Sequence, residues 1–121
     1  MTIEDVIARR RTERATLIES ARRFAVSLDP SLAVDAVVVF GSVARGDFNL
    51  WSDVDVLVVA RMAPERFLDR LDALGQPPPR IEPIVWTPAE WRAQVRRRNP
   101  IATECVESGV WLVGSPAALA R

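Results

Sequence analysis

The spacing of apolar residues along the first thirty positions predicts one long amphipathic helix over residues 2–28. Thr2 stands at its start with Asp5 three residues later, which is the spacing of a reciprocal N-terminal cap. Asp29–Pro30 ends the pattern, because the residue before a proline is forced out of the helical region. The apolar residues that recur at three- and four-residue spacing are Ile3, Val6, Ile7, Leu17, Ile18, Ala21, Ala25 and Leu28.

Four short apolar runs, too short for helices and rich in β-branched residues, predict buried strands. They cover residues 33–40, 53–60, 80–87 and 110–114. Proline, glycine and capping residues predict helices over residues 64–74, 88–97 and 100–108, a helical turn from Ser42 to Arg45, and an unstructured tail. The resulting order predicts an α/β or α+β fold, in which helices pack on a mixed β-sheet.

The length of 121 residues fits one domain, and no repeat or low-complexity segment interrupts it. We therefore expect a single domain over residues 1–121. Within it, residues 1–30 form the N-terminal helix, 34–87 the catalytic core, and 88–121 the C-terminal helices and a short strand.

The amino-acid composition excludes several kinds of catalytic and metal-binding site. The chain has no Lys, His or Tyr, which excludes imidazole triads, histidine metal sites and lysine Schiff bases. Sixteen basic residues balance sixteen acidic ones, and this neutrality argues against direct binding to nucleic acid or to a membrane. Cys105 is the single cysteine, which suits a reducing cytoplasm and is typical of a small buried residue. The apolar runs are too short to span a bilayer.

The strongest chemical signal is the pair Asp53 and Asp55 at the entrance of the predicted strand 53–60. Alternate strand residues point to one face, so both carboxylates project the same way, about 7 Å apart. Two like charges beside an apolar layer are unfavourable unless a cation lies between them. Oxygen-only donors favour Mg²⁺ or Mn²⁺, and such a pair can bridge two ions. Taken alone, the pair is better explained by two carboxylates at the end of a loop that point into water.

Gly41 and Ser42 strengthen the metal interpretation. Glycine at a strand end, followed by serine at a helical turn, offers free backbone N–H groups and a hydroxyl, which suits a phosphate group. In isolation the dipeptide fits a plain turn with a serine cap just as well. Antiparallel pairing of strands 33–40 and 53–60 would bring this turn and the two aspartates to the same edge of the sheet.

Glu82 is the candidate third carboxylate. Strand 53–60, helix 64–74 and strand 80–87 form a crossover unit, whose two strands should be parallel. Glu82 then returns to the edge that carries Asp53, as a metal ligand or as the base for an acceptor hydroxyl. The alternative is a surface glutamate beside the strand-breaking Pro83.

Together these residues resemble a known motif. GSVARGDFNLWSDVDVLVV, residues 41–59, is similar to the signature of the DNA polymerase beta nucleotidyltransferase superfamily: Gly-Ser, a spacer of about ten residues, then Asp-hydrophobic-Asp-hydrophobic. Ala44–Arg45–Gly46 and Ser52–Asp53 resemble the minimal nucleotidyltransferases. These are one-domain proteins often paired with HEPN-type partners in bacterial toxin–antitoxin modules.

The resemblance implies a role for each matching residue. Ser42, beside Gly41, would contact the triphosphate, and Asp53 and Asp55 would bind two Mg²⁺ ions. Arg45 matches a frequent family arginine and would neutralise phosphate charge, with a surface arginine as the alternative. The third acid of the family is usually Asp, so Glu82 departs from the pattern.

The sequence thus predicts a transferase that moves a nucleoside monophosphate, most simply AMP from ATP, to a hydroxyl of a partner such as a HEPN-type toxin. Two alternatives stay open. One is a binding protein of the same fold that acts as an antitoxin without catalysis. The other is a small-molecule modifier, similar to the aminoglycoside nucleotidyltransferases, that works as a homodimer.

The remaining aromatic and charged residues of interest are expected to have structural roles. The four tryptophans are expected to pack, including Trp51, although its place in the site loop would also allow it to stack on a base. Asp47 is expected to brace the loop rather than to bind metal. Arg96–Arg98 is expected to be a solvated helix end.

Overall fold

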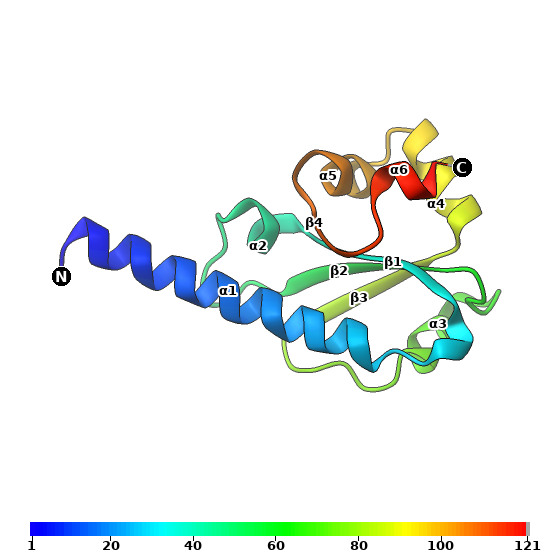
Figure 1. The fold of residues 1–121 in the computed structure, drawn as a ribbon, viewed down its shortest axis with the longest axis horizontal. Coiled ribbons are helices and arrows are strands. Elements are labelled where there is room, and N and C mark those ends of the chain that lie inside the picture. The colour runs from blue at the N-terminus through cyan, green and yellow to red at the C-terminus, as the bar shows by residue number, and fades with distance from the viewer. Residues whose placement is uncertain (121) are drawn as a thin grey trace.

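The computed structural model describes residues 1–120 and has a four-stranded mixed sheet with helices on both faces (Figure 1). The strands lie in the order β3–β2–β1–β4, and their bounds are β1 Val34–Phe40, β2 Val54–Ala60, β3 Ile81–Trp86 and β4 Val110–Val113. The predicted fold class is therefore confirmed. Each strand agrees with its predicted range to within one residue at either end.

The pairing of the strands follows the prediction. β1 pairs antiparallel with β2 and with β4, and β2 pairs parallel with β3 through a crossover that contains helix α3, Phe67–Ala73. β1 and β2 lie at the centre of the sheet, and their apolar residues are buried on both faces. This explains why both sequences are almost continuously apolar instead of alternating with polar residues.

Helix α1, Ile3–Ser27, covers one face of the sheet. The predicted cap is present: the Asp5 amide donates to Thr2 Oγ1 at 3.1 Å, and the Thr2 amide donates to Asp5 Oδ2 at 3.0 Å. The C-terminal half of the helix buries Ala21 and Phe24 against the sheet. A short 3₁₀ helix, Pro30–Leu32, follows and was not predicted.

The first turns of α1 do not pack on the sheet, although the apolar spacing continues through them. Ile3 is 77% exposed, and Val6 and Ile7 are also exposed. Figure 1 shows the reason, because the N-terminal part of α1 continues past α2, Gly41–Arg45, and beyond the sheet. The periodicity correctly identified a helix but could not show where the sheet ends.

Two arginines fasten α1 where it leaves the sheet. Arg14 donates from Nε to the Val43 carbonyl at 2.9 Å and from Nη2 to the Ala44 carbonyl at 2.8 Å. Arg10 donates to the Phe48 carbonyl, and its guanidinium lies 4.9 Å from the centre of the Phe48 ring. These contacts satisfy the carbonyls at the end of α2 and connect that helix to α1.

Three helices cover the opposite face: α4 Pro88–Arg96, α5 Pro100–Ser108 and α6 Pro116–Leu119. Trp91 lies at the centre, with ring centroids 6.3 Å from Trp86 and 5.6 Å from Trp111, so these tryptophans pack as expected. Cys105 is fully buried among them, and burial raises the pKa of its thiol to about 12. The prediction of an unstructured tail is wrong, since α6 forms and buries Leu119.

Helix α3 differs most from its prediction. It begins at Phe67 rather than near Pro64, and the apolar side chains of Phe67, Leu68 and Leu71 are exposed. The residue that turns inward is Arg70. In the part of the chain that the structure describes, no helix combines the length and apolar character needed to cross a membrane.

The Arg70 side chain forms hydrogen bonds with three different segments of the chain. Its Nε donates to the Pro64 carbonyl at 2.6 Å, and its Nη1 donates to the buried Val85 carbonyl at 3.1 Å and to Glu90 Oε1 at 2.7 Å. Each partner lies on a different segment: the turn before α3, strand β3 and helix α4. Arg70 therefore stabilises the packing of α3 against the edge of the sheet.

We expect Arg70→Ala to lower the free energy of unfolding by about 2–3 kcal/mol, because it leaves a buried carbonyl without its donor. Arg66→Ala is the matched control: Arg66 is exposed and pairs with Asp69 only at 3.9 Å, so we expect a change below about 0.5 kcal/mol. Urea denaturation measures both. Equal effects of the two substitutions would contradict the role given to Arg70.

Candidate active site

Three strand ends meet at one edge of the sheet. β1 ends there at Phe40, and β2 and β3 begin there at Val54 and Ile81. The register places Asp55 opposite Phe40 on one side and opposite Glu82 on the other. The edge that the sequence predicted is therefore formed, and it carries Asp55 and Glu82 as direct cross-strand neighbours.

Asp55 and Glu82 also share one face of the sheet. Asp55 alternates with Leu57, and Glu82 alternates with Ile84; these two apolar side chains pack with the cluster of α4 and α5. Neighbouring strands lie about 4.8 Å apart, so the two carboxylates arise side by side. Both are held by strands with buried cores, which fixes their backbones.

Gly41 lies directly against Asp55. Its φ is +77°, and a Cβ placed on it would lie only 2.3 Å from Asp55 Oδ2. A side chain is therefore excluded both by the backbone conformation and by the carboxylate. The next residue, Ser42, is half-buried, and its hydroxyl has no hydrogen-bond partner within residues 1–120. The Gly41–Ser42 turn and Asp55 thus form one continuous surface.

The electrostatics of the site centre on Asp55. Its pKa is raised, first by burial and then by the negative charges of Glu82, Asp53 and Glu104, while Arg45 acts in the opposite direction. Three acidic side chains and one arginine are thus close enough for their charges to act on Asp55. Such an arrangement is unfavourable without additional positive charge.

Arg45, at the end of α2, does not lie free in solvent. Its Nε donates to Asp47 Oδ2 at 3.3 Å, and its Nη1 donates to Glu104 Oε1 on α5. The pKa of Arg45 is raised, chiefly by the hydrogen bond to Asp47. Asp47 therefore braces the loop, as expected.

Glu104 is the residue of this cluster that the sequence did not reveal. It lies on α5, far along the chain from the Gly41–Asp55 motif, and its helix shows no pattern that marks one glutamate above another. Only the packing of α5 beside α2 brings it to Arg45. Arg45 and Glu104 lie on two helices that are far apart in the sequence, so no local pattern predicts that they pair.

Asp53 is exposed and precedes the first residue of β2. Within residues 1–120, no group of three or more His, Cys, Asp or Glu side chains is arranged as a ready metal site. The charge of Asp53 nevertheless acts on Asp55. Among the described residues, Asp53 thus lies near enough to Asp55 for its charge to act, but the acids are not grouped as ligands of one ion.

The loop between α2 and β2 exposes Leu50 and Trp51. The expectation that Trp51 packs is wrong, because its side chain is 88% exposed. The loop buries Phe48 instead. Two hydrogen bonds within the loop stabilise its shape: the Asn49 amide donates to Ser52 Oγ at 2.9 Å, and the Trp51 amide donates to Asn49 Oδ1 at 2.8 Å. Trp51 is left outside, beside the site.

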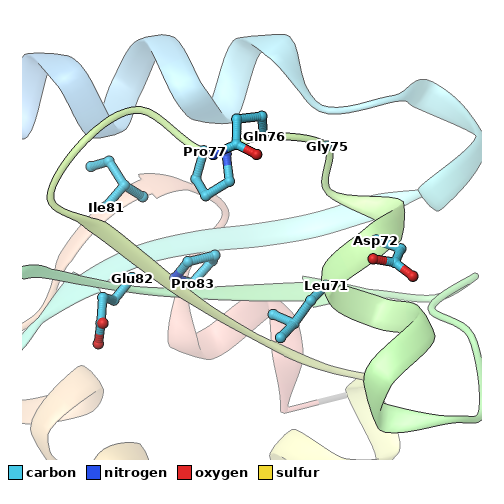
Figure 2. A pocket seen from close by; sticks show the side chains of 8 residues that line it. All are labelled: Leu71, Asp72, Gly75, Gln76, Pro77, Ile81, Glu82 and Pro83. Carbon is cyan, nitrogen blue, oxygen red and sulfur yellow. The ribbon is translucent and has the colours of Figure 1, made fainter.

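A cavity of about 560 Å³ opens between α3 and β3. Figure 2 shows Gln76, Pro77 and Leu71 around it, with the Glu82 carboxylate pointing away from the Gly75–Pro77 loop. Glu82 lines the rim of this cavity together with Ile81 and Pro83. Ile81 and Pro83 alternate with Glu82 along β3, so the cavity lies largely on the face of the sheet opposite to Asp55. We therefore do not place the chemistry there.

Comparison with known proteins gives a family and a fold. The family model for the nucleotidyltransferase domain matches residues 18–89, which contain every residue of the site except Glu104. The chain is similar to the crystal structure of a “putative nucleotidyltransferase” from Sulfolobus solfataricus, with 22% identity, a TM-score of 0.62 and 84% of each chain covered. It also matches a toxin–antitoxin crystal structure with AMP-PNP, with 15% identity, a TM-score of 0.49, and 84% of this chain and 79% of that chain covered. Among proteins with curated descriptions there is no match.

The raised pKa of Asp55 makes a prediction about stability and pH. The folded protein holds a proton on Asp55 more tightly than the unfolded chain does, so the ionised carboxylate lowers stability above the raised pKa. Without metal, Asp55→Asn should therefore raise the free energy of unfolding at pH 7. The gain should shrink as pH falls through the carboxyl range, because Asp55 is then protonated in both states.

Urea denaturation in the presence of a chelator, at pH 7 and at acidic pH, measures this effect. Asp69→Asn is the control, since Asp69 is an exposed acid on α3. A loss of stability in Asp55→Asn at pH 7, or a gain that does not change with pH, would contradict the electrostatic description of the site.

Proposed function

The chain belongs to the nucleotidyltransferase domain family, and we propose that it moves a nucleoside monophosphate, most simply AMP from ATP, to a hydroxyl group. The observation that supports this most directly is the contact of Gly41 with Asp55, beside Glu82 on the neighbouring strand. A turn suited to phosphate and a pair of carboxylates thereby share one edge of the sheet. Family membership alone would not indicate whether these residues lie together in this chain.

The donor set fits a divalent cation. Asp53, Asp55 and Glu82 offer only oxygen ligands, which is the ligand type that Mg²⁺ takes, with Mn²⁺ as the alternative. Asp55 and Glu82 are cross-strand neighbours, and the charge of Asp53 acts on Asp55. We propose that these three residues hold two Mg²⁺ ions. When bound, the ions would neutralise charge on the triphosphate and on the departing pyrophosphate.

The residues of the chain would then serve a single in-line displacement. The acceptor oxygen forms a bond to the α-phosphorus while the bond from that phosphorus to the α,β-bridging oxygen breaks, and pyrophosphate leaves. Gly41 and Ser42 bind the phosphate groups, and Arg45 donates to them. Glu82, besides its place among the ligands, accepts the proton of the acceptor hydroxyl.

We propose that the acceptor hydroxyl belongs to a partner protein of the HEPN type, as in minimal nucleotidyltransferase modules. Exposed apolar side chains lie in the loop that leads to Asp53, where Leu50 is 74% and Trp51 is 88% exposed. Exposed apolar side chains, tryptophan above all, are typical of a protein interface. The single buried thiol, Cys105, suits the cytoplasm as the place of this reaction.

We expect the wild-type protein to transfer label from [α-³²P]ATP to a co-expressed HEPN-type partner, and Asp53→Ala to lower the rate at least about 100-fold, because it removes a metal ligand. Asp69→Ala is the control and should keep the wild-type rate. Gel autoradiography with each of the four NTPs measures the transfer. Wild-type protein that binds the partner but labels nothing with any NTP would favour a binding protein without catalysis.

Gly41→Ala should abolish transfer, because its Cβ would displace the Asp55 carboxylate. Gly46→Ala is the matched control: Gly46 also has a positive φ of +92°, but nothing lies within 4 Å of its Cβ position. We expect each substitution to cost about 1–2 kcal/mol of stability, because a residue with a Cβ is strained at positive φ, and we expect only Gly41→Ala to lose activity. Thermal unfolding and the labelling assay compare the two. Equal activities would show that the contact with Asp55 does not matter for the reaction.

A further inference from the structure

The guanidinium of Arg45 is held at two of its three nitrogens. Nε donates to Asp47 and Nη1 donates to Glu104. Nη2 has no hydrogen-bond partner within residues 1–120. An arginine fixed in this way has a defined plane and one remaining nitrogen whose N–H groups are available to another acceptor.

The two carboxylates hold Arg45 from different sides. Asp47 lies two residues after Arg45 on the loop, whereas Glu104 comes from α5 on the far side of the cluster. The backbone of α5 is itself fixed next to Glu104. Cys105 is fully buried, and its carbonyl accepts from Trp111 Nε1 at 2.9 Å. Glu104 therefore extends from a rigid part of the core.

Arg45 is held close to the proposed reaction site. It lies at the last residue of α2, one turn after Gly41 and Ser42. The charges of both Arg45 and Glu104 act on Asp55, whose carboxylate lies against Gly41. The charge of Arg45 lowers the pKa of Asp55 and so acts against the neighbouring acids.

The ion pairs contribute little as stabilising contacts. Arg45 and Glu104 are 40% and 37% exposed, and pairs at this exposure contribute little to folding stability. The three side chains together carry a net negative charge, so attraction of an anion by charge alone is also weak. Their remaining effect is orientation, which lowers the entropy that a flexible arginine would lose on binding.

We propose that Glu104 is a positioning residue, which with Asp47 holds Arg45 so that Nη2 donates to a phosphate group of the bound nucleoside triphosphate. This inference rests on the proposed function. It assigns Arg45 its orientation before the nucleotide binds, and it adds α5 to the nucleotide site, a helix that lies outside the matched domain.

Comparison of Glu104→Ala with Glu104→Gln tests the proposal. Both substitutions remove the negative charge of Glu104, so any gain in attraction for the anionic ligand is the same in the two variants. Only the glutamine variant keeps an oxygen that can accept a hydrogen bond from Arg45 Nη1. We expect Glu104→Ala to bind about three- to tenfold more weakly than Glu104→Gln, because the arginine must then be ordered on binding. Isothermal titration calorimetry with magnesium ATP and with magnesium tripolyphosphate measures this ratio, and the second ligand removes any effect of the base.

The same pair of substitutions in an Arg45→Met background separates positioning from a merely structural role. If Glu104 acts through Arg45, the ratio of the two dissociation constants should fall to about one. Glu107→Ala and Glu107→Gln, on the exposed side of the same helix, should bind equally in the wild-type background. Thermal unfolding should be the same for all Glu104 variants within error.

Three outcomes overturn the inference in distinguishable ways. Equal affinities of Glu104→Ala and Glu104→Gln show that Glu104 does not position Arg45. A ratio that persists in the Arg45→Met background shows that Glu104 acts on the nucleotide by another route. A wild-type protein that binds neither magnesium ATP nor magnesium tripolyphosphate overturns the proposed function and this inference together.

Discussion

The close approach of Gly41 to Asp55 is the constraint on which the rest of the site depends. The antiparallel register of β1 and β2 sets it, because Phe40 opposes Asp55 and the chain turns into α2 at the next residue. Glycine is the residue that leaves room for the carboxylate at that turn. The Gly41–Ser42 turn and the acidic residues are therefore parts of a single packing arrangement.

This arrangement works against stability locally, and the surrounding fold offsets it. Burial and neighbouring acids raise the pKa of Asp55, so the ionised site is strained by its own charge. Strand β2, which carries Asp55, is central and buried on both faces, by α1 on one side and by α4 and α5 on the other. Such a core tolerates a cluster of like charges at its edge, where a cation and a triphosphate would restore the balance.

Local signals predicted much of this molecule. The β-branched runs, the cap at Thr2, and the Gly-Ser and Asp-x-Asp motif predicted the strands, the start of α1 and the sheet edge correctly, because each depends on neighbouring residues. The wrong predictions concern how a helix or strand packs against the rest of the protein. Periodicity could not show that α1 extends past the sheet, that α3 turns Arg70 inward, or that Glu104 on α5 meets Arg45.

The central claim is that Gly41, Asp55 and Glu82 border one cation site at the edge of the sheet. Manganese titration followed by amide NMR tests this most directly, because Mn²⁺ broadens the resonances of nuclei close to it. We expect substoichiometric Mn²⁺ to broaden the amides of Gly41, Asp55 and Glu82 first, and excess Mg²⁺ to reverse the effect. Broadening that begins instead around Gly75 and Gln76, on the opposite face of the sheet, or that spreads evenly over the exposed acids, would contradict the account.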